Sequence, residues 1–162
     1  MANIISPDEL PVLTRREVEA RILKPFLEAL EQELGTEKTI EIITRAVTKD
    51  ALAHGAKQAE LHGSNKLEDL PAICSHHSEG GSLDVECTRL SENKLLYKTL
   101  RCEYCDMYKR LGMEKWGPYL SCMRDEAFFK GINPDFAFER TQTLMTGGEC
   151  CDSVIIDTKG EN

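Results

Sequence analysis

The amino-terminal third of the chain places apolar residues at intervals of three and four. Over residues 14–34 this spacing is typical of an amphipathic helix, because such positions share one helix face. Thr14 and Glu17 are spaced as a capping box at its start, and Gly35 marks its end. Pro25 lies inside the stripe, so we expect it to kink the helix or divide it in two. The stripe consists of Val18, Ile22, Leu23, Phe26, Leu27, Leu30 and Leu34.

The same periodicity continues over residues 36–61 and ends near Gly63, which predicts a second helix. Residues 64–81 are rich in polar side chains and carry no sustained period. We therefore expect a polar connector there, between a helical amino-terminal half and the rest of the chain.

After the connector the pattern changes to an alternation of apolar and polar residues, which is typical of strands. The sequence therefore predicts an α+β fold, with an antiparallel sheet of about four strands, amino-terminal helices and two short helices inserted between hairpins. The expected elements are a hairpin over residues 82–101 that turns at 91–94, helices over 102–111 and 118–130 that end at Gly112 and Gly131, and strands over 136–145 and 150–157 around a turn at 146–149.

A chain of 162 residues has the length of one domain. Its first residues lack a basic segment followed by an apolar run, and no apolar run approaches the roughly 18 residues of a membrane span. We therefore expect a soluble, cytoplasmic protein with no membrane partner. The expected division is an amino-terminal arm over residues 1–13, a single domain over 14–157 with a helical half 14–63, a connector 64–81 and a mixed half 82–157, and a tail over 158–162.

Charge and cysteine content narrow the class of protein further. The net charge is −8, and the acidic residues are spread along the chain, so no basic face for a nucleic acid is expected. Cysteine occurs seven times, an odd number. In a reducing compartment this content favours free thiols, ligands or catalysts over a disulfide framework.

Five of the seven cysteines fall between residues 102 and 152, in a segment that also carries acids and an arginine. Cys122 and Asp125 stand three residues apart in a predicted helix and share one face, so one can attack or coordinate while the other moves a proton. A thiolate is a strong nucleophile once its pKa is lowered. Cys151 is a second candidate catalytic thiol. A buried apolar role for each cysteine is the competing interpretation.

Four further residues are candidates for substrate binding. Arg140 has the strand parity of inward-facing neighbours, so it either grips a substrate carboxylate or forms a salt bridge with an acid such as Asp125. Thr141 and Thr143 lie on the opposite face of the predicted strand, where a simple β-forming role competes. Tyr104 can stack on a flat heterocycle.

A metal site is the alternative use of these residues. Cys102, Cys105 and Cys122 come near zinc-ribbon spacing, but the second Cys-x-x-Cys pair is missing. A functional zinc or iron ion on Cys122, Cys151 and Asp125 is the other possibility, and otherwise no cofactor is expected. The histidines of residues 54, 62, 76 and 77 are interpreted as solvated or connector residues.

The order and spacing of several short motifs resemble the 2-aminothiazoline-4-carboxylate hydrolase family over residues 14–157. The final motif is also similar to the end of vinyl-reductase-type small-molecule-binding domains. These motifs are Ala20-Arg21-Ile22, Cys102-x-Tyr104 with Tyr108 and Leu111-Gly112, Cys122-x-x-Asp125, Asn133-Pro134, Arg140-Thr141 and Gly147-x-x-x-Cys151-Asp152.

The resemblance implies a small-molecule hydrolase that opens a cyclic isothiourea bearing a carboxylate and yields a carbamoyl-cysteine-type product. The catalytic candidates are then Cys122, as nucleophile, or Asp125, as base toward water, with Cys151 nearby and Arg140 orienting the carboxylate. Two other classes stay open. One is a non-catalytic domain that binds a small ligand, and the other is a thiol or metal enzyme that uses Cys122 and Cys151 on a soft metal or sulfur-containing substrate. A homo-oligomer is possible in each case.

Overall fold

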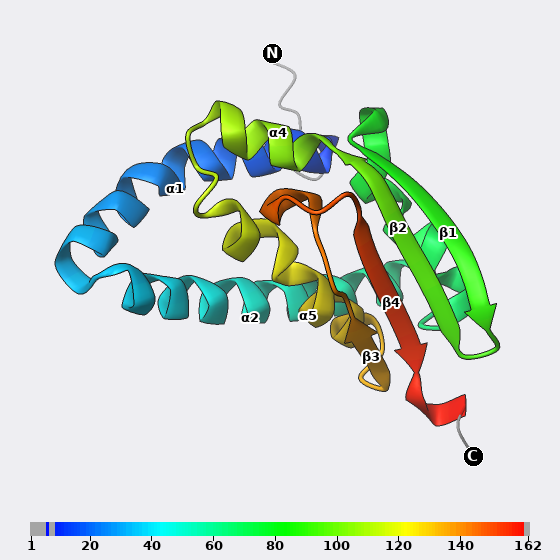
Figure 1. The fold of residues 1–162 in the computed structure, drawn as a ribbon. Helices are drawn as coiled ribbons and strands as arrows, with labels where there is room; N and C mark the ends of the chain where they lie inside the picture. The colour runs from blue at the N-terminus through cyan, green and yellow to red at the C-terminus, as the bar shows by residue number, and fades with distance from the viewer. Residues whose placement is uncertain (1–5, 7–8, 161–162) are drawn as a thin grey trace, which may run out of the picture.

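The computed structural model describes residues 6 and 9–160. Two long helices, α1 (Val12–Leu34) and α2 (Thr36–His62), form an antiparallel pair joined at Gly35 (Figure 1). Gly35 has a φ of 80°, a backbone conformation that suits glycine. The predicted pair of amino-terminal helices is therefore confirmed. The predicted arm falls partly on residues 1–5 and 7–8, and the predicted tail partly on 161–162, which lie outside the described residues.

The predicted start of the first helix is wrong, and of the two outcomes expected at Pro25 the division of the helix does not occur. The helix begins at Val12 after Pro11, and no side chain caps it, so Thr14 and Glu17 form no capping box. Pro25 does not divide the helix. Its ring removes one backbone donor, but Pro25 is exposed, so water can satisfy the carbonyl that loses its partner.

The segment predicted as a polar connector is folded. It contains a 3-10 turn at Leu67–Asp69, the short helix α3 (Leu70–Cys74) and a 3-10 stretch at Ser75–Gly81. Leu67, Leu70 and Ile73 drive this folding, because all three are buried in the main core. Three apolar positions over so short a segment are too few to establish a helical period against the surrounding polar residues.

The four strands form one antiparallel sheet in the order β1-β2-β4-β3, which confirms the predicted α+β fold. The hairpin of β1 (Leu83–Ser91) and β2 (Lys94–Cys102) turns where the sequence predicts, with Ser91 opposite Lys94. The edge strand β3 (Phe136–Glu139) pairs with β4 (Cys151–Asp157). Because β3 ends at Glu139, the predicted strand over 136–145 is too long.

The two inserted helices are α4 (Glu103–Arg110) and α5 (Arg124–Ile132), and a π-helical turn at Pro118–Cys122 precedes α5. Gly112 ends the α4 region with a φ of 63°, as predicted. Gly131 does not end α5, because it lies inside that helix. A Cβ atom there would lie 2.2 Å from the Leu52 carbonyl oxygen, so Gly131 allows α5 to approach α2 closely.

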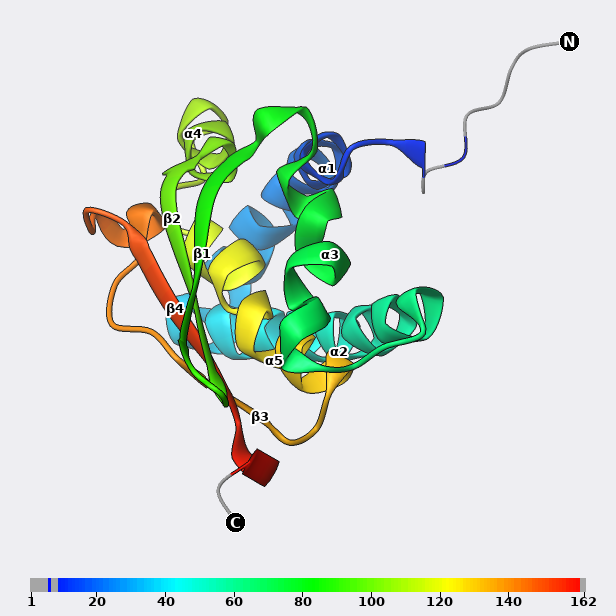
Figure 2. The same ribbon diagram turned by 90° about the vertical axis from the view of Figure 1, so that its right-hand side faces the viewer.

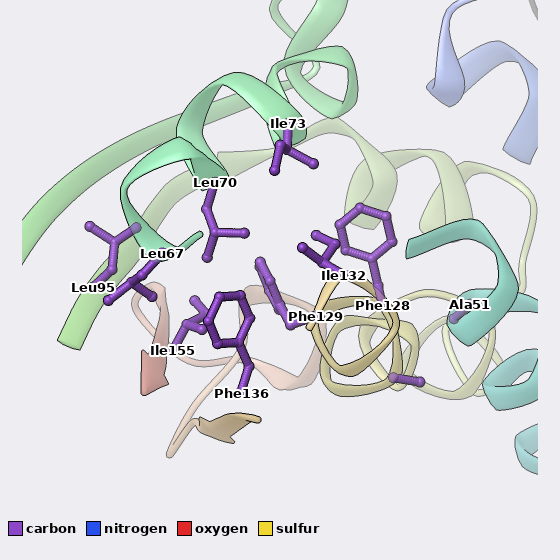
Figure 3. Packing of buried hydrophobic residues seen from close by; sticks show 11 residues of the cluster. Ala51, Leu67, Leu70, Ile73, Leu95, Phe128, Phe129, Ile132, Phe136 and Ile155 are labelled. Carbon is purple, nitrogen blue, oxygen red and sulfur yellow. The ribbon is translucent and has the colours of Figure 1, made fainter. Parts of the chain in front are cut away.

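Figure 2 shows the sheet along one side of the molecule, with α5 and α3 beside it and α2 beyond. The main hydrophobic core fills the space between them (Figure 3) and includes Phe128, Phe129, Phe136 and Ile155. A second core lies around Tyr108 and joins α1, α2 and α4. Together the two cores fix the position of the first turn of α5, which carries the candidate site.

Among the described residues, no helix has both the length and the apolar character that crossing a membrane requires.

Candidate functional site

A cavity of about 330 Å³ lies between the inner face of the sheet, the segment 71–78 and the first turn of α5. Four of the predicted catalytic and substrate-binding residues line it: Cys122, Asp125, Cys151 and Tyr104. They come from a π-helical turn, two α-helices and a strand. The fold therefore brings the predicted thiols and the predicted acid to one cavity.

Asp125 is the acid of this cavity. Its carboxylate accepts a hydrogen bond from Nη1 of Arg140 at an N–O distance of 2.5 Å, while 45% of its side chain is still exposed where it lines the cavity. Burial raises the pKa of Asp125 above its usual value, and the Arg140 guanidinium opposes that rise. A carboxyl group with a raised pKa that faces a cavity is suited to general acid–base chemistry.

Arg140 supports Asp125 and does not line the cavity. Its Nη2 donates to the Cys122 carbonyl oxygen at 2.9 Å, and its guanidinium lies over the Phe138 ring at 5.2 Å from the centroid. Only 13% of the side chain is exposed. This geometry corresponds to the salt-bridge alternative of the sequence analysis. The role of Arg140 in binding a substrate carboxylate remains a prediction.

The thiols of this cavity are protonated near neutral pH. Burial raises the pKa of Cys122 to about 12, and the nearby Asp125 adds to the rise. Burial also raises the pKa of Cys151, although the Leu144 backbone N–H donates to its Sγ at 3.4 Å and opposes the rise. The same cavity receives three more cysteines, Cys74, Cys87 and Cys102. The site is therefore rich in sulfur, and burial disfavours the thiolate form of its cysteines.

Thr141 and Thr143 do not line the cavity. Both follow the end of β3, so the predicted strand face does not exist for them. Asp152 accepts hydrogen bonds from the Thr141 backbone N–H at 3.0 Å and from its hydroxyl. Thr143 caps the 3-10 turn at Leu144–Thr146. These contacts hold the loop after β3 in place beside β4.

Two arginines that sequence reasoning missed line the cavity. Arg16 comes from the first turns of α1, and Arg124 precedes Asp125 in α5. Arg16 pairs with Glu19 at 2.5 Å, and Arg124 pairs with Asp50. Their side chains are only 16% and 13% exposed, respectively. Nothing in the local sequence distinguishes them from surface arginines, because their position depends on how α1 and α5 each pack against α2.

Three of the four histidines, His54, His76 and His77, form a half-buried cluster and are not solvated as expected, whereas His62 is exposed. The ring centroids of His76 and His77 lie 3.9 Å apart, and that of His54 lies within 5.9 Å of both. All three rings contact Phe128. Burial lowers the pKa of His54 to about 4, lowers that of His76, and lowers that of His77 well below its usual value. The correction follows from the folding of the connector, which carries His76 and His77 inward.

Tyr97 lines the cavity, but its Oη atom is buried. No nitrogen or oxygen atom of the described residues hydrogen-bonds to that Oη atom, and its close polar neighbours are the thiols of Cys74 and Cys87. Burial raises the pKa of Tyr97. Because thiols are weak hydrogen-bonding groups, they offset the lost hydration of the hydroxyl only in part.

No group of three or more histidine, cysteine, aspartate or glutamate side chains in the described part of the chain is arranged to hold a metal ion. Neither predicted ligand set forms such a group: not the zinc-ribbon cysteines, and not Cys122, Cys151 and Asp125. The geometry therefore does not support the zinc or iron site that the sequence left open.

A comparison with known families shows which family the chain belongs to. The family model described as L-2-amino-thiazoline-4-carboxylic acid hydrolase matches residues 15–154. No curated protein matches the chain. The family match covers nearly the whole chain and includes every predicted site residue, so the resemblance noted in the sequence is confirmed. The chain belongs to the L-2-amino-thiazoline-4-carboxylic acid hydrolase family.

Proposed function

We propose that this protein hydrolyses a cyclic isothiourea that bears a carboxylate, of the 2-aminothiazoline-4-carboxylate type, with Asp125 as general base. The observation that carries the proposal is the environment of the Asp125 side chain. Its carboxyl group faces the cavity, is oriented by Arg140 and has a raised pKa, in a chain of this hydrolase family.

The reaction adds one water molecule across the ring. Asp125 removes a proton from water, and the oxygen bonds to the ring carbon that carries sulfur and both nitrogens. The attack breaks the π bond between that carbon and the ring nitrogen, and the nitrogen takes the proton that Asp125 holds. In the collapse of the tetrahedral carbon the new hydroxyl group gives its proton to Asp125, the bond to the ring sulfur or to the ring nitrogen breaks, and the departing atom takes that proton. Cleavage at sulfur gives N-carbamoyl-cysteine, and cleavage at nitrogen gives S-carbamoyl-cysteine. One carboxyl group therefore serves first as base and then as acid.

Cys122 and Cys151 have a different role in this proposal. With a pKa raised to about 12, the Cys122 thiol is a poor nucleophile at neutral pH. Both thiols stay protonated and form part of the cavity wall, where their polarisable sulfur atoms pack against the ring of the substrate.

The substrate carboxylate binds Arg16 and Arg124, which line the cavity and are largely buried. Guanidinium groups bind carboxylates through two parallel hydrogen bonds, and that geometry fixes the direction of the ring. Arg140 then acts as a positioning residue for Asp125. This assignment differs from the sequence-based expectation that Arg140 itself holds the carboxylate.

Turnover of L-2-amino-thiazoline-4-carboxylate, followed by chromatography and mass spectrometry, tests the proposal. The wild-type protein should yield a carbamoyl-cysteine, and Asp125→Asn should lower kcat by about 10²- to 10⁴-fold, the usual contribution of a general base. Asp106→Asn is the matched control, because Asp106 is an exposed acid of α4 that does not line the cavity. No product from the wild-type protein, or equal turnover by the two variants, would refute the assignment.

A further inference from the structure

One face of α1 carries large apolar side chains that point away from the rest of the protein. Val18, Ile22 and Phe26 are 51%, 59% and 64% exposed, although the sequence places them on the stripe expected to pack inward. The second half of α1 forms an outer edge of the molecule (Figure 1). At about 100° per residue, the centre of the exposed face lies roughly 130° around the helix from the centre of the buried face. The buried residues of the helix are Val12, Ala20 and Leu27.

The exposed face has the spacing of a helix–helix interface. Val18, Ile22, Pro25 and Ala29 are all exposed, and they are separated by four, three and four residues. This is the spacing of the a and d positions of a coiled coil, and Phe26 lies beside them. Five of the ten large hydrophobic side chains that are exposed among the described residues belong to α1. The outer stripe, defined as Val18, Ile22, Pro25, Phe26 and Ala29, is therefore a continuous apolar surface.

Two opposite charges lie along one side of the outer stripe. Arg21 and Glu28 each precede an a position, so both occupy g positions of the same heptad pattern. In an antiparallel pair of helices the g positions of one helix face those of the other. A register that places Ile22 opposite Pro25 of a second copy also places Arg21 opposite Glu28 of that copy, and a two-fold axis repeats the contact.

Both charged groups are available for such a contact. Arg21 pairs with Glu17 of its own helix at 2.6 Å, but its side chain is 60% exposed, and Nε and Nη2 bind the same Glu17 oxygen. The N–H groups of Nη1 can therefore reach a second carboxylate. Glu28 is exposed, and its carboxylate forms no ion pair with the described residues. The charges beside the outer stripe are thus complementary to those of a second copy.

Charge also favours a second copy over a membrane as the occupant of this face. The helix α1 carries four basic and five acidic side chains, a net charge of −1, in a chain whose net charge is −8. The mutual repulsion of two copies is therefore weak where they meet at α1. Helices that lie on membranes are rich in Lys and Arg beside the apolar face, whereas the other side of this stripe bears Glu19 and Glu33.

We propose that two copies of this chain form a two-fold symmetric dimer through antiparallel packing of their α1 helices. The outer stripes are in contact, and Arg21 of each copy lies against Glu28 of the other. The apolar contact runs from Val18 to Ala29, about 18 Å along each helix, so the interface is small. We expect a dissociation constant of about 10–100 μM.

Sedimentation equilibrium at protein concentrations from about 2 to about 500 μM measures this constant. Ile22→Glu should raise it at least about 30-fold, because the dimer would bury a carboxylate without a partner at the centre of the stripe. Leu61→Glu is the matched control, since Leu61 is 68% exposed on α2 and lies outside the stripe. The control should leave the dissociation constant unchanged.

Charge reversal tests the orientation and the register of the two helices. Arg21→Glu and Glu28→Arg should each raise the dissociation constant about tenfold, because each creates two pairs of like charges across the axis. The double variant restores opposite charges and should return the constant to within about threefold of the wild-type value. Arg45→Glu is the control, because Arg45 is an exposed arginine of α2 that also pairs with a glutamate four residues earlier.

Circular dichroism establishes that each variant is folded, and the charge variants decide the outcome by themselves if Ile22→Glu is not. A wild-type protein that stays monomeric up to about 500 μM overturns the proposal. Equal dimerisation of Ile22→Glu and Leu61→Glu overturns it as well. A double charge variant that recovers none of the affinity lost in the single variants contradicts the antiparallel register. These measurements contain no substrate, so their result is independent of the proposed hydrolysis.

Discussion

Replacement of Gly55 by alanine tests the packing that positions the site. A Cβ atom on Gly55 would lie 2.0 Å from the Phe128 carbonyl oxygen and 3.0 Å from the Ile132 backbone nitrogen. Both atoms belong to the backbone of α5, so no side-chain rotation relieves the clash. To reach ordinary van der Waals contact, α2 and α5 must separate by about 1 Å or more.

The magnitude follows from two opposing effects. Alanine in a helix is favoured over glycine by about 1 kcal/mol, whereas overpacking of a close contact costs about 1–3 kcal/mol and occasionally more. With a separation as short as 2.0 Å, we expect the clash to dominate and the free energy of unfolding to fall by about 2 kcal/mol. Because α5 carries Asp125, the same displacement should lower kcat/KM by about 100-fold.

Urea unfolding followed by the fluorescence of Trp116, the single tryptophan, measures the stability change. Lys49→Ala is the control, because Lys49 is exposed on the same helix and its replacement should change stability by less than about 0.5 kcal/mol. If Gly55→Ala is as stable as the wild-type protein, or more stable by the helix preference of alanine, the close contact between α2 and α5 does not exist.

Three further predictions concern single groups. Arg140→Gln should move the acidic limb of the kcat/KM profile to higher pH, because the guanidinium opposes the burial that raises the pKa of Asp125; a higher KM with an unmoved limb would favour carboxylate binding by Arg140. The folded-state pKa of His54 is about 4, below its ordinary value of 6.5, so the unfolded chain binds more protons between these values. Stability should therefore fall as pH drops through that window, by about 1 kcal/mol at pH 5.5 after allowance for partial exposure, and His54→Gln should reduce the fall more than His62→Gln does. Tyr97→Phe should leave the thermal midpoint unchanged or raise it, since the buried hydroxyl has only weakly bonding thiols beside it; a clear decrease would show that these contacts stabilise the fold.

The sequence predicts those parts of the fold that depend on local patterns. The two long helices follow from sustained periodicity, and the hairpin follows from alternation on either side of a polar turn at residues 91–94. The main errors of the sequence-based prediction arise where tertiary contacts decide the structure. The segment 64–81 folds because Leu67, Leu70 and Ile73 pack into a core that distant elements supply. The strand β3 ends at Glu139, and in the loop that follows Asp152 accepts hydrogen bonds from the backbone amides of Thr141 and Gln142.

The candidate site is likewise only partly predictable from the sequence. Cys122 and Asp125 can be paired from their spacing on one turn of chain, and family motifs add Cys151 and Tyr104. Arg16 and His77 cannot be found in this way. Arg16 reaches the cavity from α1, and His77 reaches it from the folded stretch Ser75–Gly81. The state of the thiols also escapes the sequence, since burial and not residue type raises the pKa of Cys122.

Intact-protein mass spectrometry during a single turnover of L-2-amino-thiazoline-4-carboxylate tests the central claim most directly. If Asp125 activates water, the carbamoyl-cysteine forms while the mass of the protein stays that of the free chain at every quench time. A transient mass increase equal to the ring-opened substrate, lost in Cys122→Ser, would show that a thiol attacks the ring and would contradict the account.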